Sequence, residues 1–415
     1  MPEQHIQIET FQNGLTLLVE TMPSVQSAAF SFLVPAGSIY EPLGQNGTTA
    51  ILSDLITRGA GAYDSRELLA ILDTLGVQGG ESPNNSFLTL SGATLAANLP
   101  QVLSVYADIL LRPHLPEDQF DAARAGVTQS LRAIEDEPQQ KLMPELRRRA
   151  YESPWGLSPD GSLADLPLIT ADSVKEHYKK CVRPGGTILA IAGNVDAKEI
   201  SDQVRRCFGD WERKPDPTFE TSPGGPKHDH IRHDSEQTHI GIAYNGLTFS
   251  DPDYYAAWAA ACVLGNGMSS RLFTEIREKR GLCYSVSASL TGFKHEGRMI
   301  CYAGTTSERA QETLDLTLAE IHRLSKGITE EELARCKAMV KSSLIMQQES
   351  TRARARTMAA HWHHLNDLLT LDEVRQKIDS LTLGSIQNFL DAHPPANFTV
   401  LTIGPEPLEI HRELS

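Results

Sequence analysis

The sequence predicts an α+β protein made of two homologous domains, each a largely antiparallel sheet packed with helices. Three observations support this prediction. The chain of 415 residues is longer than one hydrophobic core usually organises. Strand-like and helix-like segments are mixed without strict β-α-β alternation, which favours antiparallel sheets. The two halves also repeat, because LPEDQFDAARAGVTQSL (115–131) aligns without a gap on ITEEELARCKAMVKSSL (328–344), at an offset of 213 residues.

Both aligned segments open with the signals of a helix start. Pro116 stands in the first turn of the first segment, and Thr329 with Glu332 forms a capping box in the second. Glu117 matches Glu330 at the beginning of each segment. We therefore expect a long helix at the same place in each domain.

The remaining elements follow the same order in the two halves. Strands are expected where apolar and polar residues alternate or form short apolar runs, and helices where apolar residues recur at helical spacing. The expected strands are 27–38, 86–94 and 187–195 in the first half and 238–249, 285–293, 300–306 and 397–405 in the second. The expected helices after the first strand of each half are 64–76 and 253–280. The predicted domains are 1–213 and 237–415.

The segment between the domains, 214–236, is predicted to be a flexible linker. Its prolines, paired glycines and mixed charges are typical of an exposed tether. His228, His230 and His233 form a cluster that could chelate a metal, although the composition favours a solvated tether. A second cluster lies in HWHH (361–364), where the first and last histidines could share a helix face. Metal binding stays open at both clusters.

Composition and charge exclude several classes of protein. The net charge of −15 argues against nucleic acid or an anionic membrane as the main partner, since both repel an acidic surface. The six cysteines include no C-x-x-C pair, so neither a zinc ribbon nor a redox motif is indicated. No apolar run approaches the roughly 18 to 20 residues that span a bilayer. The first 14 residues also lack the basic and apolar regions of a secretory signal, so we expect a cytoplasmic protein without a membrane span.

Four segments carry a resemblance to a known family. They are NGLTLLVE (13–20), AGSIYEP (36–42), IAGNVD (191–196) and SSRLFTEIREKRGLCYS (269–285). In this order they resemble the insulinase/pitrilysin family of inverted-motif zinc peptidases, above all its short two-domain members related to the subunits of mitochondrial processing peptidase. The match covers essentially the whole chain. The resemblance implies two α+β domains that face each other as a clamshell and hold a peptide between them.

The metal motif of that family is missing from this sequence. Active members carry H-x-x-E-H on a helix and a distal glutamate, and the inner Glu acts as general base on a zinc-bound water. The resemblance places the two histidines on Ala50 and Asp54, the inner Glu on Ser53 and the distal Glu at Ser130. Ala50 has no donor atom, and Ser53 has no pKa suited to general base work. Since one carboxylate cannot hold catalytic zinc against water, we predict no metal or catalytic residue in the first domain.

Two other segments partly match a zinc motif. SVKEH (173–177) lacks the first His of H-x-x-E-H, and HEGRM (295–299) lacks the second His of H-E-x-x-H. We expect both to be solvated surface segments.

Arg277 and Tyr284 are the predicted substrate-binding residues. The resemblance implies that an Arg and a Tyr at this spacing reach toward the substrate backbone and the tetrahedral intermediate, which suits two strong hydrogen-bond donors. The alternative is a surface helix residue and a half-buried strand residue. GGESPNNSFLTLSG (79–92) likewise allows two interpretations, a strand edge that holds a peptide or an ordinary hairpin turn, and the hairpin is slightly favoured.

The predicted function is that of a non-metal-binding subunit of a heterodimeric zinc metallopeptidase, inactive alone. This chain would position a peptide or unfolded polypeptide, while a homologous H-x-x-E-H partner supplies zinc and the base. The alternatives are a structural subunit like the core proteins of respiratory complexes, a peptide-binding module without proteolysis, and a peptidase with a relocated metal site.

Overall fold

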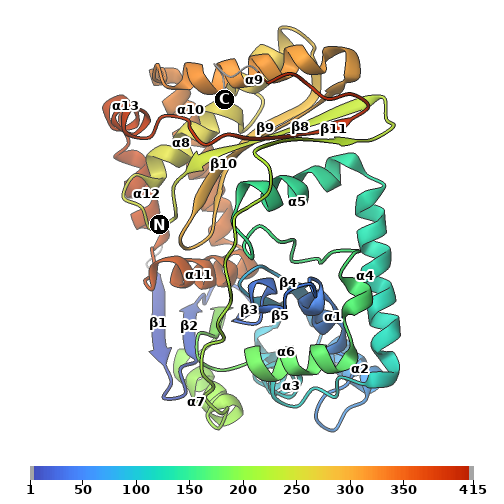
Figure 1. Cartoon of the computed structure of the whole chain (residues 1–415). Coiled ribbons are helices and arrows are strands. Elements are labelled where there is room, and N and C mark those ends of the chain that lie inside the picture. The colour runs from blue at the N-terminus through green and yellow to red at the C-terminus, as the bar shows by residue number, and fades with distance from the viewer. Residues whose placement is uncertain (1–3, 411–415) are drawn as a thin grey trace. The chain divides into compact units, whose positions relative to one another are not determined.

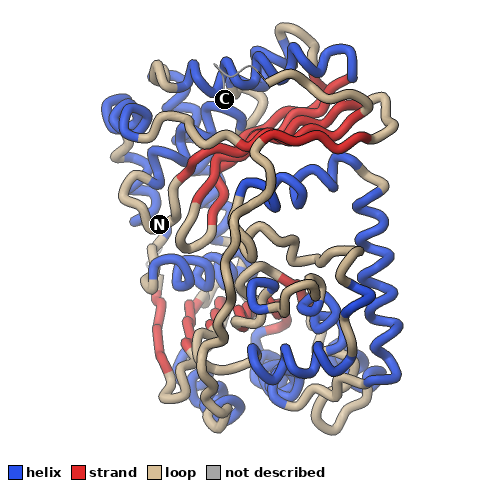
Figure 2. Tube along the Cα trace, viewed as in Figure 1, coloured by secondary structure: helices blue, strands red, loops and turns tan. Residues whose placement is uncertain are grey.

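The computed structural model describes residues 4–410, which divide into two compact units. Within the described residues, unit 1 comprises 4–133, Leu157–Thr221 and Met346–Thr370, and unit 2 comprises Ile134–Gly156, Ser222–Ile345 and 371–410. Each unit contains its own sheet with helices packed against it (Figures 1 and 2). The predicted α+β class with two sheet-containing halves is confirmed.

The sheet of unit 1 has six strands in the order β1-β2-β6-β3-β5-β4. The strands are β1 (His5–Thr10), β2 (Thr16–Thr21), β3 (Ser27–Val34), β4 (Gln78–Pro83), β5 (Leu88–Leu95) and β6 (Ile188–Gly193). Its helices are α1 (Thr48–Leu55), α2 (Ser65–Thr74), α3 (Leu99–Leu111), most of α4 (Phe120–Glu135), α6 (Ala171–Cys181) and α7 (Ala197–Phe208). Only the β2–β6 pair is parallel among the described strands of this sheet, so it is largely antiparallel as predicted.

The sheet of unit 2 repeats this plan with five strands in the order β7-β11-β8-β10-β9. The strands are β7 (His228–Arg232), β8 (Gln237–Gly246), β9 (Cys283–Gly292), β10 (Gly297–Thr306) and β11 (Thr399–Gly404). Its helices are α8 (Tyr254–Gly265), the π-helix η5 (Phe273–Glu278), α9 (Ala310–Leu324), most of α10 (Glu330–Gln348), α12 (Leu371–Asp379) and α13 (Leu383–Ala392). The parallel pair β7–β11 takes the place of β2–β6.

Two predicted segments differ from the structure. The expected helix 253–280 is interrupted after α8, since Asn266 leaves the helical conformation and Gly267 has φ +94°. Residues 228–232 of the predicted linker form β7, which pairs in parallel with β11. An edge strand with one solvent-facing side can be polar, so linker-like composition concealed it.

The two repeats exchange one helix each. Helix α5 (Pro138–Ala150) lies in the first repeat but belongs to unit 2, where it packs on β8 and β11. Helix α11 (Thr351–Leu365) lies in the second repeat but belongs to unit 1, where it packs on β3 and β6. Their first residues are again 213 positions apart, so the exchange follows the internal repeat. The ranges 1–213 and 237–415 therefore describe the two sequence repeats. Each folded unit, by contrast, combines most of one repeat with a helix from the other (Figure 1).

Apolar contacts and one arginine attach each exchanged helix. Leu142 and Leu146 of α5 pack over Gly241 in the sheet of unit 2, and a side chain added at Gly241 would meet both of them. In the same helix, Arg149 Nε and Nη2 donate to one oxygen of Asp229 on β7, at 2.8 and 2.7 Å. Strand β7, which lies within the predicted linker, thus supplies the carboxylate that binds Arg149 of α5.

The other exchanged helix is held by a buried ion pair. Arg354 on α11 is 2% exposed and Glu20 on β2 is 4% exposed. Arg354 Nε donates to Glu20 Oε2 at 2.8 Å, and the second oxygen of Glu20 accepts from Gln4 Nε2 at 2.6 Å. Both carboxylate oxygens have donors, which burial of a charge requires.

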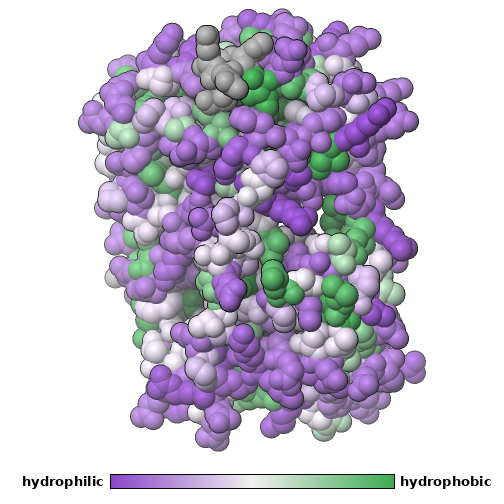
Figure 3. Space-filling view, in the orientation of Figure 1, coloured by the Kyte–Doolittle hydropathy of each residue, from purple (hydrophilic) through white to green (hydrophobic). Residues whose placement is uncertain are grey.

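The surface is mainly hydrophilic on the face drawn in Figure 3, with hydrophobic residues in small separate groups. Within residues 4–410, none of the helices combines the length and the apolar character that crossing a membrane would need.

Candidate functional site

Helix α1 carries three of the positions on which the resemblance places the metal motif, and its start is firmly held. The carboxylate of Glu41 accepts hydrogen bonds from the backbone N–H groups of Gly47, at 3.0 Å, and Thr49, at 2.7 Å, and from Asn46 Nδ2 at 3.0 Å. It therefore occupies two donors that a helix start leaves unpaired. Burial raises the pKa of Glu41 to about 7. Gly47 has φ +121°, and a side chain there would also collide with Leu166.

The residues at the four motif positions do not fit a zinc ion. Ala50 is 7% exposed and offers only a methyl group, and Ser53 Oγ donates to the Ala50 carbonyl at 2.8 Å. The Asp54 carboxylate is paired with Arg58 one turn further on. Ser130 on α4 donates to the Gly126 carbonyl at 3.2 Å. Each polar group is thus engaged within its own helix or, for Asp54, by Arg58 just beyond the end of α1, and only Asp54 is of a type that binds zinc well.

No replacement metal site was found in the described part of the chain. Across residues 4–410, no group of three or more His, Cys, Asp and Glu side chains is placed to hold a metal ion. In the first histidine cluster, His230 lies on β7 and its Nδ1 is 2.8 Å from Thr402 Oγ1. In the second, the His363 ring packs edge-on against Phe87 at 4.6 Å, and burial lowers the pKa of His361 to about 4. His230, His361 and His363 are thus partly buried in the fold, whereas His228 is exposed.

The expectation that SVKEH is a solvated segment was wrong. His177 is buried on α6, and its Nε2 lies 3.2 Å from both the Ala36 carbonyl and Thr49 Oγ1. Burial lowers the pKa of His177 to about 4, so the ring is neutral near pH 7. It joins α6 to α1 and is structural. In HEGRM, the His295 ring lies 4.1 Å from that of Trp155.

Arg277 lies in a π-helix. Lys279 N–H donates to the Thr274 carbonyl five residues back, at 3.0 Å, which widens the turn that carries Arg277. Such turns are rare and often occur at functional sites. The guanidinium carbon lies 4.8 Å from the centre of the Phe273 ring and 5.6 Å from that of Tyr284. Phe273 was not predicted as a site residue, although its position four residues before Arg277 is a recognisable helical pair spacing.

Tyr284 lies in a β-bulge at the start of β9. Ser285 pairs with Gly304 of β10 and Cys283 pairs with Thr305, so Tyr284 is the extra residue. A bulge re-aims the side chain it carries, and the Tyr284 side chain is 82% exposed although Cys283 is buried. The alternative of a half-buried strand tyrosine is therefore wrong. The structure places Arg277 and Tyr284 side by side on the surface of unit 2.

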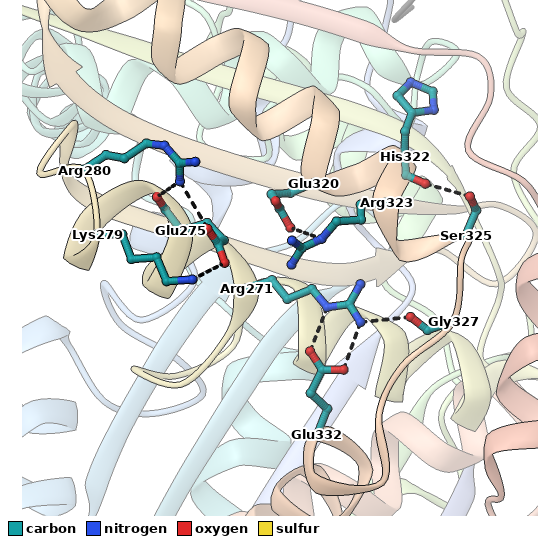
Figure 4. Close-up of polar contacts among 10 residues, drawn as sticks. All are labelled: Arg271, Glu275, Lys279, Arg280, Glu320, His322, Arg323, Ser325, Gly327 and Glu332. Carbon is teal, nitrogen blue, oxygen red and sulfur yellow. Dashed lines mark hydrogen bonds and ion pairs between the residues drawn. The ribbon is translucent and has the colours of Figure 1, made fainter.

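Ion pairs hold the π-helix from both ends (Figure 4). Before it, Arg271 makes two bonds to the Glu332 carboxylate, at 2.7 and 2.9 Å, and a third to the Gly327 carbonyl at 2.9 Å. Towards its end, Glu275 pairs with Lys279 at 2.7 Å and with Arg280 at 3.1 Å. These contacts fix the backbone from which Arg277 projects.

GGESPNNSFLTLSG forms the β4–β5 hairpin, the geometry of the favoured interpretation. The turn is closed by Asn84 N–H, which donates to the Phe87 carbonyl at 2.8 Å. Strand β4 is also an edge of the unit 1 sheet. A Cβ at Gly79 would lie 2.0 Å from the Ser91 carbonyl oxygen, so this glycine is needed for close strand packing.

Relatives of this chain are bacterial proteins named as zinc proteases. An uncharacterized zinc protease of Streptomyces coelicolor is 27% identical over 384 residues, which cover 90% of this chain and 84% of the relative. The uncharacterized zinc protease YmxG of Bacillus subtilis is 27% identical over 379 residues, covering 90% and 92%. An uncharacterized zinc protease of Rickettsia felis is 24% identical over 408 residues, covering 98% and 99%.

Two solved structures share the fold over nearly the whole chain. A peptidase M16 inactive domain from Pseudomonas fluorescens has a TM-score of 0.89 at 21% identity and covers 98% of this chain and 99% of its own. A protease from Helicobacter pylori has a TM-score of 0.88 at 21% identity, with coverage of 98% and 100%. The family model of insulinase (peptidase family M16) matches residues 16–158, and that of the peptidase M16 inactive domain matches residues 168–340. Together the two matches span most of the chain, which therefore belongs to the insulinase family, peptidase family M16.

Proposed function

We propose that this chain is the non-metal-binding subunit of a heterodimeric metallopeptidase and that Arg277 and Tyr284 hold its peptide substrate. A homologous partner with an intact H-x-x-E-H motif supplies the zinc and the general base. A cytoplasmic location is part of the proposal.

One observation carries the proposal: both residues project from backbone irregularities that expose them. The π-helix turns Arg277 outward and the bulge turns Tyr284 outward, and the guanidinium contacts the phenol ring. Irregularities of this kind cost free energy and cluster at functional sites. They leave a guanidinium and a hydroxyl facing solvent, as a peptide-binding surface requires.

The chemistry of the pair suits a peptide backbone. A guanidinium and a phenol O–H both donate to carbonyl oxygens, and such donors stabilise the negative charge that develops on the carbonyl during hydrolysis. Helix α1 supports the division of labour, since Ala50, Ser53 and Asp54 cannot activate a water. This chain can therefore orient a substrate without performing the hydrolysis itself.

The first experiment is native mass spectrometry of the protein isolated, with its bound partners, from its own cells. The proposal expects a complex of about twice the chain mass with zinc on the other polypeptide. A metal-free homo-oligomer, or zinc on this chain alone, would contradict it.

The second experiment measures peptide cleavage by that complex. Arg277→Gln and Tyr284→Phe are expected to lower kcat by about tenfold or more, since loss of one donor to a developing oxyanion typically costs 10²–10³. Arg335→Gln is the matched control, because Arg335 is a surface arginine of unit 2 whose ion pair with Glu331 joins adjacent turns of α10. Unchanged cleavage by both variants would favour a purely structural subunit. Peptide binding without any cleavage would favour a binding module.

A further inference from the structure

The surface around Tyr284 carries two guanidinium groups without carboxylate partners. Among the described residues, neither Arg277 nor Arg309 makes an ion pair, and Arg309 Nη1 donates instead to the Gly281 carbonyl at 2.5 Å. The neighbouring arginines are paired: Arg271 with Glu332, Arg280 with Glu275 and Arg323 with Glu320 (Figure 4). In a chain of net charge −15, these two guanidinium groups are cations without an ion-pair partner among the described residues: Arg277 contacts the exposed Tyr284, and Arg309 contacts the Gly281 carbonyl three residues before it.

Arg277 is held in a way that leaves its donors available. Its guanidinium carbon lies over the Phe273 ring and the Tyr284 ring, so the contacts are made by aromatic faces rather than by acceptors. Its N–H groups make no hydrogen bond within the part of the chain that the structure describes. The adjacent Glu278 forms no ion pair with it there either. The N–H groups of a guanidinium lie in its plane in a rigid fork, and aromatic contact restricts the motion of that fork.

We infer that this site selects peptides by a carboxylate, either the free C-terminus of the chain or an Asp or Glu side chain. The inference rests on the proposed function and names the class of peptide that the same site prefers. A backbone carbonyl presents one oxygen, whereas a carboxylate presents two and can accept both prongs of the Arg277 fork. Arg309, whose Nη1 donates to the Gly281 carbonyl, adds a second positive charge. A carboxylate therefore gains both a geometric match and charge neutralisation.

The test is fluorescence anisotropy with the full-length protein and short fluorescein-labelled peptides of alanine, serine and glutamine. One pair has the same sequence with a free or an amidated C-terminus. A second pair, amidated throughout, differs by one internal Glu or Gln. The inference expects the carboxylate member of at least one pair to bind about tenfold more tightly, as charge-assisted hydrogen bonds allow. The pair that shows the difference identifies the source of the carboxylate.

Two variants test whether the difference in peptide affinity arises at Arg277. Arg277→Lys keeps the charge but loses the fork and the ring contacts, so it is expected to reduce the preference for the carboxylate severalfold. Arg335→Gln is expected to leave it unchanged.

Different binding results overturn the carboxylate preference and the proposed peptide site. Equal binding within both pairs, with an affinity that still falls in Arg277→Lys, overturns the carboxylate preference and keeps the peptide site. A carboxylate preference that persists in Arg277→Lys overturns the assignment to Arg277. No binding of any of the peptides overturns both.

Discussion

Removal of one partner from the buried Arg354–Glu20 pair is expected to release helix α11 from unit 1. Arg354→Met deletes the guanidinium that donates to Glu20 Oε2 at 2.8 Å and leaves a carboxylate that is 4% exposed. Breaking a buried ion pair from one side typically costs about 3–5 kcal/mol, because the remaining charge stays buried. Gln4 still donates to the other oxygen at 2.6 Å, so the lower end, about 3 kcal/mol, is expected.

The double variant Arg354→Met with Glu20→Leu separates the pair from the packing. Replacing both partners with apolar side chains removes the buried charge, and such replacements are often neutral or stabilising. We therefore expect the double variant to be more stable than Arg354→Met, which is unusual for a second core substitution. Arg352→Met is the matched control on the same helix, since Arg352 is exposed and, among the residues that the structure describes, donates only to Gln78.

The measurement is urea and thermal unfolding, followed by far-UV circular dichroism and by tryptophan fluorescence. The two probes are needed because two units need not unfold in one transition. A loss of about 3 kcal/mol corresponds to roughly 6–12 °C in Tm for a unit of this size. Single and double variants that lose stability equally, or a single variant as stable as the Arg352 control, would refute the claim that this ion pair fastens the exchanged helix.

Three further predictions concern α1 and the site on unit 2. Burial raises the pKa of Glu41 to about 7, so its contribution to stability is present below pH 4.5 and lost as the pH rises to 7; His177, lowered from 6.5 to about 4, contributes in the opposite sense. Each contribution is at most about 3 kcal/mol. As the pH falls from 7 to 5 in urea titrations, Glu41→Gln should lose stability relative to the wild-type protein and His177→Gln should gain it. The same dependence of unfolding free energy on pH in the variants and the wild type would contradict this. Arg271→Ala should cost about 2–3 kcal/mol by leaving Glu332 unpaired, and should also weaken peptide binding through Arg277; retained affinity in a folded variant would show that η5 does not depend on this pair. After zinc loading and dialysis, plasma mass spectrometry should find no stoichiometric metal, and a zinc that disappears in Asp54→Ala would contradict our interpretation of α1.

The internal repeat made the two-sheet plan predictable from the sequence. The matched segments at an offset of 213 residues reflect α4 and α10, which occupy equivalent positions before the exchanged helices. The exchange of helices between the units leaves no local pattern in the sequence, because an amphipathic helix such as α5 has the same apolar periodicity whichever sheet it covers. Its destination is decided by long-range contacts such as Arg149 with Asp229.

The errors have specific physical causes. The linker prediction at β7 was wrong because HDHIR has the polar composition of a loop, and its residues are exposed or only partly buried in the strand. The surface prediction for His177 was wrong because Val174 and Cys181, at helical spacing from it, lie on the same buried face. At α6 this apolar spacing indicates burial, whereas HDHIR, with Ile231 as its one apolar residue, offers no such pattern.

The backbone irregularities at the site were beyond prediction. The spacing of Arg277 and Tyr284 was recognised, but a π-turn and a β-bulge are one-residue register shifts that hydrophobic periodicity does not resolve. Without them, regular helical and strand geometry would give each side chain a different direction. Their exposure and mutual contact came only from the structure.

These irregularities also bear on the choice between a binding subunit and a scaffold. A scaffold gains little from a tyrosine that is 82% exposed or from an arginine that has no acidic partner within residues 4–410, since exposed groups contribute little to stability. The fold nonetheless supports this surface with the Arg271–Glu332 pair and the Glu275 contacts. On α1, by contrast, Glu41 stabilises a helix start that leads to an alanine, a serine and a paired aspartate. The proposed function accounts for both features: a ligand would occupy Arg277 and Tyr284, and a partner would supply the metal that the residues of α1 do not fit.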